Sequence, residues 1–150
     1  MAATPAGRDL SYGVARGAIC DGAGRLVAVR HGCYPDLPGT VSAVALSFES
    51  GQWLVMVDPD DDSVRIQELS ASRHREFDFC DPAEGSPWAP ALGRRVSWFW
   101  ALENQRGYVD GVQLSFADAG RGPVPGAGDE VCQVQLIAAA SCWRIHGWTA

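Results

Sequence analysis

Lysine is absent from this 150-residue chain, whose basic residues are 12 arginines. The absence excludes chemistry that needs a lysine amine, such as Schiff-base catalysis or the phosphate-binding lysine of a P-loop. The formal net charge is −6 at pH 7, which disfavours nucleic acid as a partner because phosphate contacts need a basic surface. An acidic surface attracts basic proteins, so the composition favours a cationic protein as the partner.

The sequence also shows no pattern typical of a secretory leader or of a membrane-spanning segment. The N-terminal stretch MAATPAGRDLSYG has neither a basic start nor a long apolar core, unlike a secretory signal. No stretch approaches the roughly 18 apolar residues that are needed to cross a bilayer. We therefore expect a cytoplasmic protein with no membrane partner, and the sequence leaves its oligomeric state open.

Sequence motifs for nucleophilic or redox catalysis are not found. The chain contains no G-x-S-x-G, no H-E-x-x-H and no C-x-x-C, which are patterns typical of hydrolases, zinc proteases and thiol oxidoreductases. Its five cysteines are expected as free thiols, because no secretory signal accompanies them. We assign no catalytic residue and no cofactor. Whether the protein is an enzyme stays open, because catalytic groups can meet in space without a sequence motif.

The acidic run DPDDD at residues 58–62 is a candidate metal site. Asp58, Asp60 and Asp62 occupy alternate positions, as the first oxygen ligands of a calcium loop do. An EF-hand loop then requires a glycine and, at its twelfth position, a bidentate glutamate, whereas this chain has Ser63 and Leu69 there. We therefore predict no metal and favour a turn in which aspartate side chains bond their own backbone.

Apolar and polar residues alternate with a period of two along most of the chain, which is typical of strands with one buried face. The clearest case is a three-strand meander over residues 41–69. Further strands are predicted around residues 112–116, 132–136 and 143–148, and a hairpin over residues 12–30. The chain is expected to be one domain over 1–150, all-β or β-rich α+β. It would form a mainly antiparallel sandwich or partly open barrel of seven to nine strands with at most one or two short helices.

A strand rich in tryptophan is predicted just after residue 95. Strict alternation would place Val96, Trp98, Trp100 and Leu102 on one face and Phe99 on the other. Because both faces would be apolar, we expect a central strand that is buried on both sides and anchors the fold. Burial of one large aromatic side chain contributes roughly 1.5–3 kcal/mol.

The polar stretch that follows this strand is the candidate binding site. A hairpin needs few special residues for its geometry, whereas this loop supplies amides, a guanidinium, a phenol and two carboxylates. The candidate binding residues are Glu103, Asn104, Gln105, Arg106, Tyr108 and Asp110. Two interpretations stay open: the side chains form a self-satisfied network in which Arg106 bridges Glu103 and Asp110, or they form a binding or catalytic surface.

Two other segments interrupt the strand pattern. Residues 70–93 have no sustained period and contain three prolines, although residues 72–77 can form one helical turn. A connection of this length is uncommon in a compact domain, so it either has a function or hides further structure. Residues 117–128 are rich in glycine, proline and alanine, which predicts an exposed hairpin loop.

The stretch from Trp98 to Leu114, of the form W-x-W-x-L-x-N-Q-x-G-Y-x-D-G-x-Q-L, resembles a bacterial domain family of unknown function. The segment VMVDPDDDSVRI is similar to the middle of that family, and the resemblance covers about half of the chain. It implies no known activity. Small size and acidity are also features of bacterial immunity proteins that are paired with toxins, and this resemblance is one of general protein class.

Three functions remain as hypotheses. The first is a non-enzymatic binding protein, such as an immunity-type inhibitor of a cationic protein, whose surface combines the 104–110 loop, the DPDDD turn and residues 70–93. The second is a small enzyme or ligand-binding barrel with its polar site at the 103–110 loop. The third is a structural subunit of an assembly. Acidity and the lack of catalytic motifs favour the first.

Overall fold

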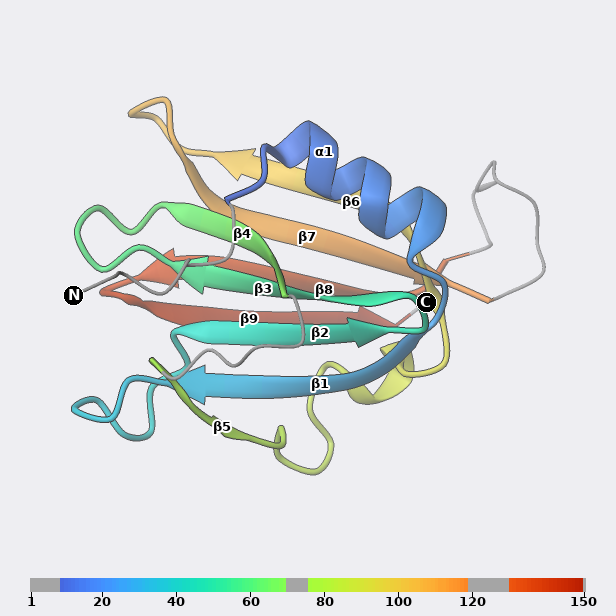
Figure 1. Cartoon of the computed structure of the whole chain (residues 1–150), viewed down its shortest axis with the longest axis horizontal. Coiled ribbons are helices and arrows are strands. Elements are labelled where there is room, and N and C mark those ends of the chain that lie inside the picture. Colours follow the sequence, from blue (N-terminus) through green and yellow to red (C-terminus); the bar gives the residue numbers. More distant parts are fainter. Residues whose placement is uncertain (1–8, 70–75, 119–129, 150) are drawn as a thin grey trace.

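Two antiparallel β-sheets stacked face to face form the fold (Figure 1). The computed structural model describes residues 9–69, 76–118 and 130–149. One sheet has the strand order β4-β3-β2-β1-β5 and the other the order β6-β7-β8-β9. The predicted β-rich class is confirmed, and the sheets form a sandwich rather than a closed barrel.

Strand order follows chain order within each sheet, apart from β5. The predicted meander over residues 41–69 is confirmed as β2, β3 and β4, and the predicted last strand is β9. Of the helices in the described ranges, none has the length and apolar character needed to cross a bilayer. The elements are α1 (Tyr12–Gly17), the π-helical turn η1 (Ala18–Gly22), β1 (Leu26–Cys33), β2 (Ala43–Phe48), β3 (Gly51–Val57), β4 (Val64–Leu69), β5 (Asp78–Cys80), the 3₁₀ turn η2 (Ala89–Ala91), β6 (Arg95–Glu103), β7 (Val109–Ala117), β8 (Glu130–Ala139) and β9 (Cys142–Thr149).

The core lies between the sheets and consists of side chains that alternate inward along each strand. Val44 and Val55 of the first sheet are fully buried and belong to the same apolar cluster as the inward residues of the second. Trp143 of β9 also donates its indole N–H to the carbonyl oxygen of Val55 at 3.2 Å, which joins the two sheets. The positions that the alternation predicts as buried in β7 and β8 are buried: Val112, Leu114, Phe116, Cys132, Val134 and Leu136. Gly111, Ser115 and Ala138 of these strands are buried as well.

The prediction of a strand in the first half of a hairpin over residues 12–30 is wrong. Residues 12–22 are helical, and only the second half of that hairpin, β1, is a strand. Ser11 caps the helix by accepting a hydrogen bond from the backbone N–H of Val14 at 3.3 Å. Ala15, Ile19 and Ala23 are all buried at a spacing of four, which is the period of a helix face and not of a strand. This face packs into the core beside β6 (Figure 1).

The tryptophan-rich strand β6 is an edge strand, so the predicted central position is wrong. The register with β7 shifts between Val96 and Trp98, which makes Ser97 the extra residue of a β-bulge. A bulge reverses the alternation beyond it. Val96 and Phe99 are therefore buried, whereas Trp98 and Trp100 are 44% and 37% exposed on the outer face of the second sheet.

The segment between β5 and β6 closes one side of the sandwich. Trp88 is 1% exposed and donates its indole N–H to Nε2 of His31 on β1 at 3.0 Å. A Cβ atom on Gly147 of β9 would lie 2.5 Å from Cβ of Pro87, so β9 also contacts this segment directly. Part of the segment 70–93 therefore packs against the sandwich. The sequence did not indicate this role, because the segment has no regular alternation of apolar and polar residues. The helical turn predicted from residue 72 falls mainly on residues outside the described part, as does most of the predicted 117–128 loop.

Candidate functional site

The 103–110 loop joins β6 to β7 as a tight hairpin whose backbone is held by Asn104. The N–H of Asn104 donates to the carbonyl oxygen of Tyr108 at 3.0 Å, and the N–H of Gly107 donates to the carbonyl oxygen of Asn104 at 3.0 Å. The side-chain Oδ1 of Asn104 accepts the N–H of Arg106 at 2.8 Å, which is an Asx turn. Gly107 has φ of +84°, a left-handed conformation that glycine adopts without strain.

The predicted site residues divide into two groups. Asn104 and Asp110 are bonded to each other, with Nδ2 of Asn104 donating to Oδ2 of Asp110 at 3.3 Å. The second group consists of Glu103, Gln105, Arg106 and Tyr108, of which the first three are exposed and Tyr108 is half-buried. Their side chains form no hydrogen bond or ion pair with the described residues, so Arg106 does not bridge Glu103 and Asp110.

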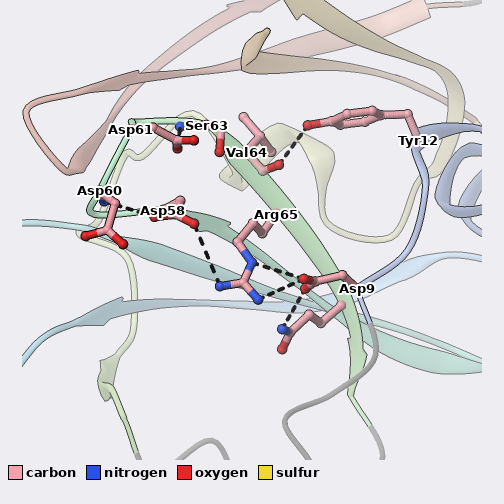
Figure 2. Close-up of polar contacts among 9 residues, drawn as sticks. Asp9, Tyr12, Asp58, Asp60, Asp61, Ser63, Val64 and Arg65 are labelled. Carbon is pink, nitrogen blue, oxygen red and sulfur yellow. Dashed lines mark hydrogen bonds and ion pairs between the residues drawn. The ribbon is translucent and has the colours of Figure 1, made fainter.

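The acidic turn between β3 and β4 uses its carboxylates to close its own backbone (Figure 2). Asp58 Oδ1 accepts the N–H of Asp60 at 2.9 Å, and Asp61 Oδ1 accepts the N–H of Ser63 at 2.8 Å. The hydrogen bond from Ser63 lowers the pKa of Asp61, which is fully exposed. Asp62 Oδ1 accepts the backbone N–H of Ser141 at 2.7 Å, which ties this turn to the turn between β8 and β9. In the described ranges, no three His, Cys, Asp or Glu side chains gather as a metal site would require.

An ion-pair cluster beside this turn fixes the start of the described chain to β4. Arg65 donates to Oδ2 of Asp9 at 2.8 Å and lies 3.9 Å from Oδ2 of Asp58, while Gln67 donates to Oδ1 of Asp9 at 2.8 Å (Figure 2). Burial of Asp9 would raise its pKa, but the hydrogen bonds from Arg65 and Gln67 outweigh burial and the pKa of Asp9 is lowered. Tyr12 adds a bond from its hydroxyl to the carbonyl oxygen of Val64 at 2.8 Å, and burial raises its pKa to about 12.

Both predicted loops lie at the same end of the sandwich, together with the connection between β1 and β2 (left in Figure 1). Their acidic residues are Asp36 from the β1–β2 connection, the four aspartates of the acidic turn, and Glu103 and Asp110 from the hairpin. Asp36, Asp60, Asp61 and Glu103 are exposed. Arg106 and Arg65 are the basic residues of these loops and their adjoining strand, and Arg65 is already paired with Asp9 and Asp58. The described part of this end therefore carries an excess of negative charge.

The fold and this geometry define a β-sandwich with an acidic loop end. The chain belongs to the family described as "Family of unknown function (DUF6334)", whose model matches residues 21–150. No curated protein and no solved structure matches the chain.

Sequence reasoning missed two features. The first is Asp9, whose pairing with Arg65 joins positions too far apart in sequence to be predicted without coordinates. The second is the outer face of the second sheet, where Gln113, Gln133 and Gln135 lie side by side. The strand patterns VQLSF and VCQVQL carry the signal for these glutamines, but the interpretation of Trp98 as buried concealed the aromatic part of the same face.

Proposed function

We propose that this protein is a non-enzymatic binding protein that recognises a basic protein partner through the acidic end of its sandwich. Two acidic loops that are separated by about 40 residues of sequence lie at the same end of the sandwich, and this observation carries the proposal. An excess of one charge on one surface steers an oppositely charged partner and selects against partners of like charge.

The acidic turn suits recognition because its backbone is fixed before any partner arrives. Asp58 and Asp61 each bind a backbone N–H within the turn, and Asp62 binds that of Ser141. A partner therefore meets carboxylates whose positions are already restricted, and less conformational entropy is lost on binding. Asp60 is exposed, and none of the described residues bonds to its carboxylate.

An immunity-type inhibitor of a cationic toxin is the form of this function that has a direct cellular test. Its acidic surface would cover the basic, substrate-binding surface of the toxin. A deep pocket walled by Trp98 or Trp100 and opening at the 103–110 loop would favour the alternative of a small enzyme or ligand-binding barrel. Both side chains lie instead on an exposed sheet face, so this alternative has less support.

The test is co-expression with the product of the gene adjacent to the one for this chain, scored as survival of the host. Wild-type protein should restore growth. The double variant Asp60→Asn and Asp61→Asn should restore it less and bind the gene product about tenfold more weakly, roughly 1.4 kcal/mol. Asparagine still closes Asx turns, so the backbone is kept. The control variant, Asp81→Asn with Glu84→Gln, removes two exposed charges from the connection after β5.

Host death with wild-type protein present would overturn the immunity function. Equal rescue by the two double variants would show that the acidic end is not the contact surface. Binding measured by calorimetry should also weaken as salt is raised from 0.05 to 0.5 M, because exposed charges are screened over about 10 Å at 0.1 M.

A further inference from the structure

The outer face of the second sheet carries a pattern of side chains that the acidic end does not use. Strand register places these residues in two rows that cross all four strands. The first row, from β6 to β9, is Trp98, Ser115, Gln133 and Trp148, and the second is Trp100, Gln113, Gln135 and His146. Neither row contains an aspartate, glutamate or arginine, and Ser115 of the first row is fully buried.

Aromatic rings line both sides of this face, which we call the Trp–Gln face. The rings of Trp98 and Trp100 are stacked, with centroids 5.9 Å apart and planes inclined by 20°. They are 44% and 37% exposed, and Trp148 on the opposite edge is 50% exposed. Side chains as large as tryptophan are normally buried because of the apolar area they remove from water. Three exposed on one face therefore indicate a surface that another molecule covers.

Glutamine amides fill the space between the tryptophans. Gln135 donates to Gln113 at 3.1 Å, Gln113 donates to Gln133 at 2.9 Å, and Gln133 donates to Glu130 at 2.9 Å. A primary amide has two N–H donors, and each glutamine uses one in this chain. The mutual bonds fix the three amides in place, and within the described ranges the second N–H of each glutamine has no acceptor, which leaves it for an external one.

We infer that the Trp–Gln face binds a neutral carbohydrate chain. A pyranose ring has an apolar face of C–H groups, which packs on an indole ring and removes apolar area from both. Its hydroxyl groups lie around the ring edge, where they can accept and donate hydrogen bonds. The Trp–Gln face offers the matching arrangement, because indole rings flank a row of fixed amides and neither row contains an aspartate, glutamate or arginine that would favour an ionic ligand.

The dimensions of the face suit an oligosaccharide rather than a single sugar. Neighbouring strands lie 4.7–4.9 Å apart, so three intervals from β6 to β9 separate Trp98 from Trp148 by about 14 Å. A hollow of about 190 Å³ lies at the β9 end and is lined by Glu130, Cys132, Gln133, Trp148 and Thr149. Pockets for drug-sized ligands hold roughly 300–1,000 Å³, so this hollow suits one sugar ring, and the Glu130 carboxylate can accept from its hydroxyls.

The test is binding of the purified full chain to an array of neutral glycans, followed by calorimetry and tryptophan fluorescence with cellohexaose, chitohexaose, xylohexaose and maltohexaose. Binding of at least one glycan with a Kd in the micromolar to millimolar range is expected, with a change in tryptophan emission. Trp98→Ala and Trp100→Ala should each weaken it at least tenfold, and Gln113→Ala several-fold. Val27→Ala removes an apolar side chain that is 61% exposed on β1 and is the matched control, with no effect expected.

A blank array, or binding that survives Trp98→Ala combined with Trp100→Ala, would overturn this inference. Circular dichroism of the variants checks that loss of binding is not loss of folding, and the exposed positions of Trp98 and Trp100 make folding of their variants the expected result. Sedimentation that shows a wild-type dimer and a monomeric Trp98→Ala variant would also overturn it, because the face would then be covered by a second copy. The acidic-end variant Asp60→Asn with Asp61→Asn should bind glycans normally, so the two proposals can fail separately.

Discussion

Truncation of Trp88 tests whether the segment after β5 holds the sandwich closed. The side chain is 1% exposed and packs in the main core cluster together with residues of both sheets. Tryptophan-to-alanine changes in a core cost about 3–5 kcal/mol, because transfer free energy is lost and a cavity remains. The change Trp88→Ala should therefore destabilise the protein by about 3–5 kcal/mol, which for a chain of this length lowers Tm by about 6–20 °C.

The hydrogen bond of Trp88 adds a second component to this cost. Nε2 of His31 accepts the indole N–H at 3.0 Å in a half-buried site. Loss of the donor leaves this nitrogen without its protein partner, at a cost of about 1 kcal/mol or more. Trp88→Phe keeps most of the ring and removes the donor, so its effect should fall between wild type and Trp88→Ala.

The assay is urea unfolding followed by circular dichroism, with Trp148→Ala as the control. Trp148 loses the same atoms but is 50% exposed, so this change should cost less than about 1 kcal/mol. The reasoning is refuted if Trp88→Ala and Trp148→Ala have the same free energy of unfolding. That result would mean that the segment before β6 lies on the sandwich without stabilising it.

Three further predictions concern the described core and its ionisable groups. Gly111→Ala should destabilise by about 1–3 kcal/mol in thermal unfolding, because its new Cβ would lie 2.8 Å from a backbone carbonyl oxygen of β8. Burial lowers the pKa of His31 below its usual 6.5. The unfolded chain therefore binds more protons just below that value, and stability should fall as pH drops from about 6.5 toward the folded pKa; His31→Gln should remove this dependence. Native protein treated with iodoacetamide should react at exposed Cys80 and spare buried Cys132, whose pKa is raised by burial; mass spectrometry of the labelled peptides checks this, and equal labelling would contradict the described packing.

The strands of this fold are largely predictable from sequence where alternation is uninterrupted. In β7 and β8, each inward residue is apolar, so the period identifies the core face, whereas it does not indicate that Ser115 on the opposite face is also fully buried. The same method failed at β6 because Ser97 adds one residue to the count. Alternation before and after a bulge is out of phase, and no residue type marks Ser97 as the insertion.

The helix at residues 12–22 was hidden for a different reason. It is short, and its buried residues are Ala15 and Ile19, followed by buried Ala23 at the C-cap, so its apolar stripe is narrow. The spacing of four between Ala15, Ile19 and Ala23 was present in the sequence, whereas the cap by Ser11 became evident only with coordinates. The candidate loop illustrates another limit. The sequence predicts a hairpin with polar side chains. Only the structure separates the bonded pair of Asn104 and Asp110 from the four residues whose side chains have no hydrogen-bond or ion-pair partner among those described.

The bulge at Ser97 also affects how molecules of this protein stay apart. The outer edge of a sheet presents unpaired N–H and C=O groups that can add a strand from another molecule and begin aggregation. Lysine is a common safeguard on such edges, and this chain has none. The bulge twists β6 and interrupts its row of backbone groups, while Leu10 donates to the Ile66 carbonyl and occupies the edge of β4. At these two edges, a bulge in β6 and a paired segment beside β4 thus limit the addition of a further strand.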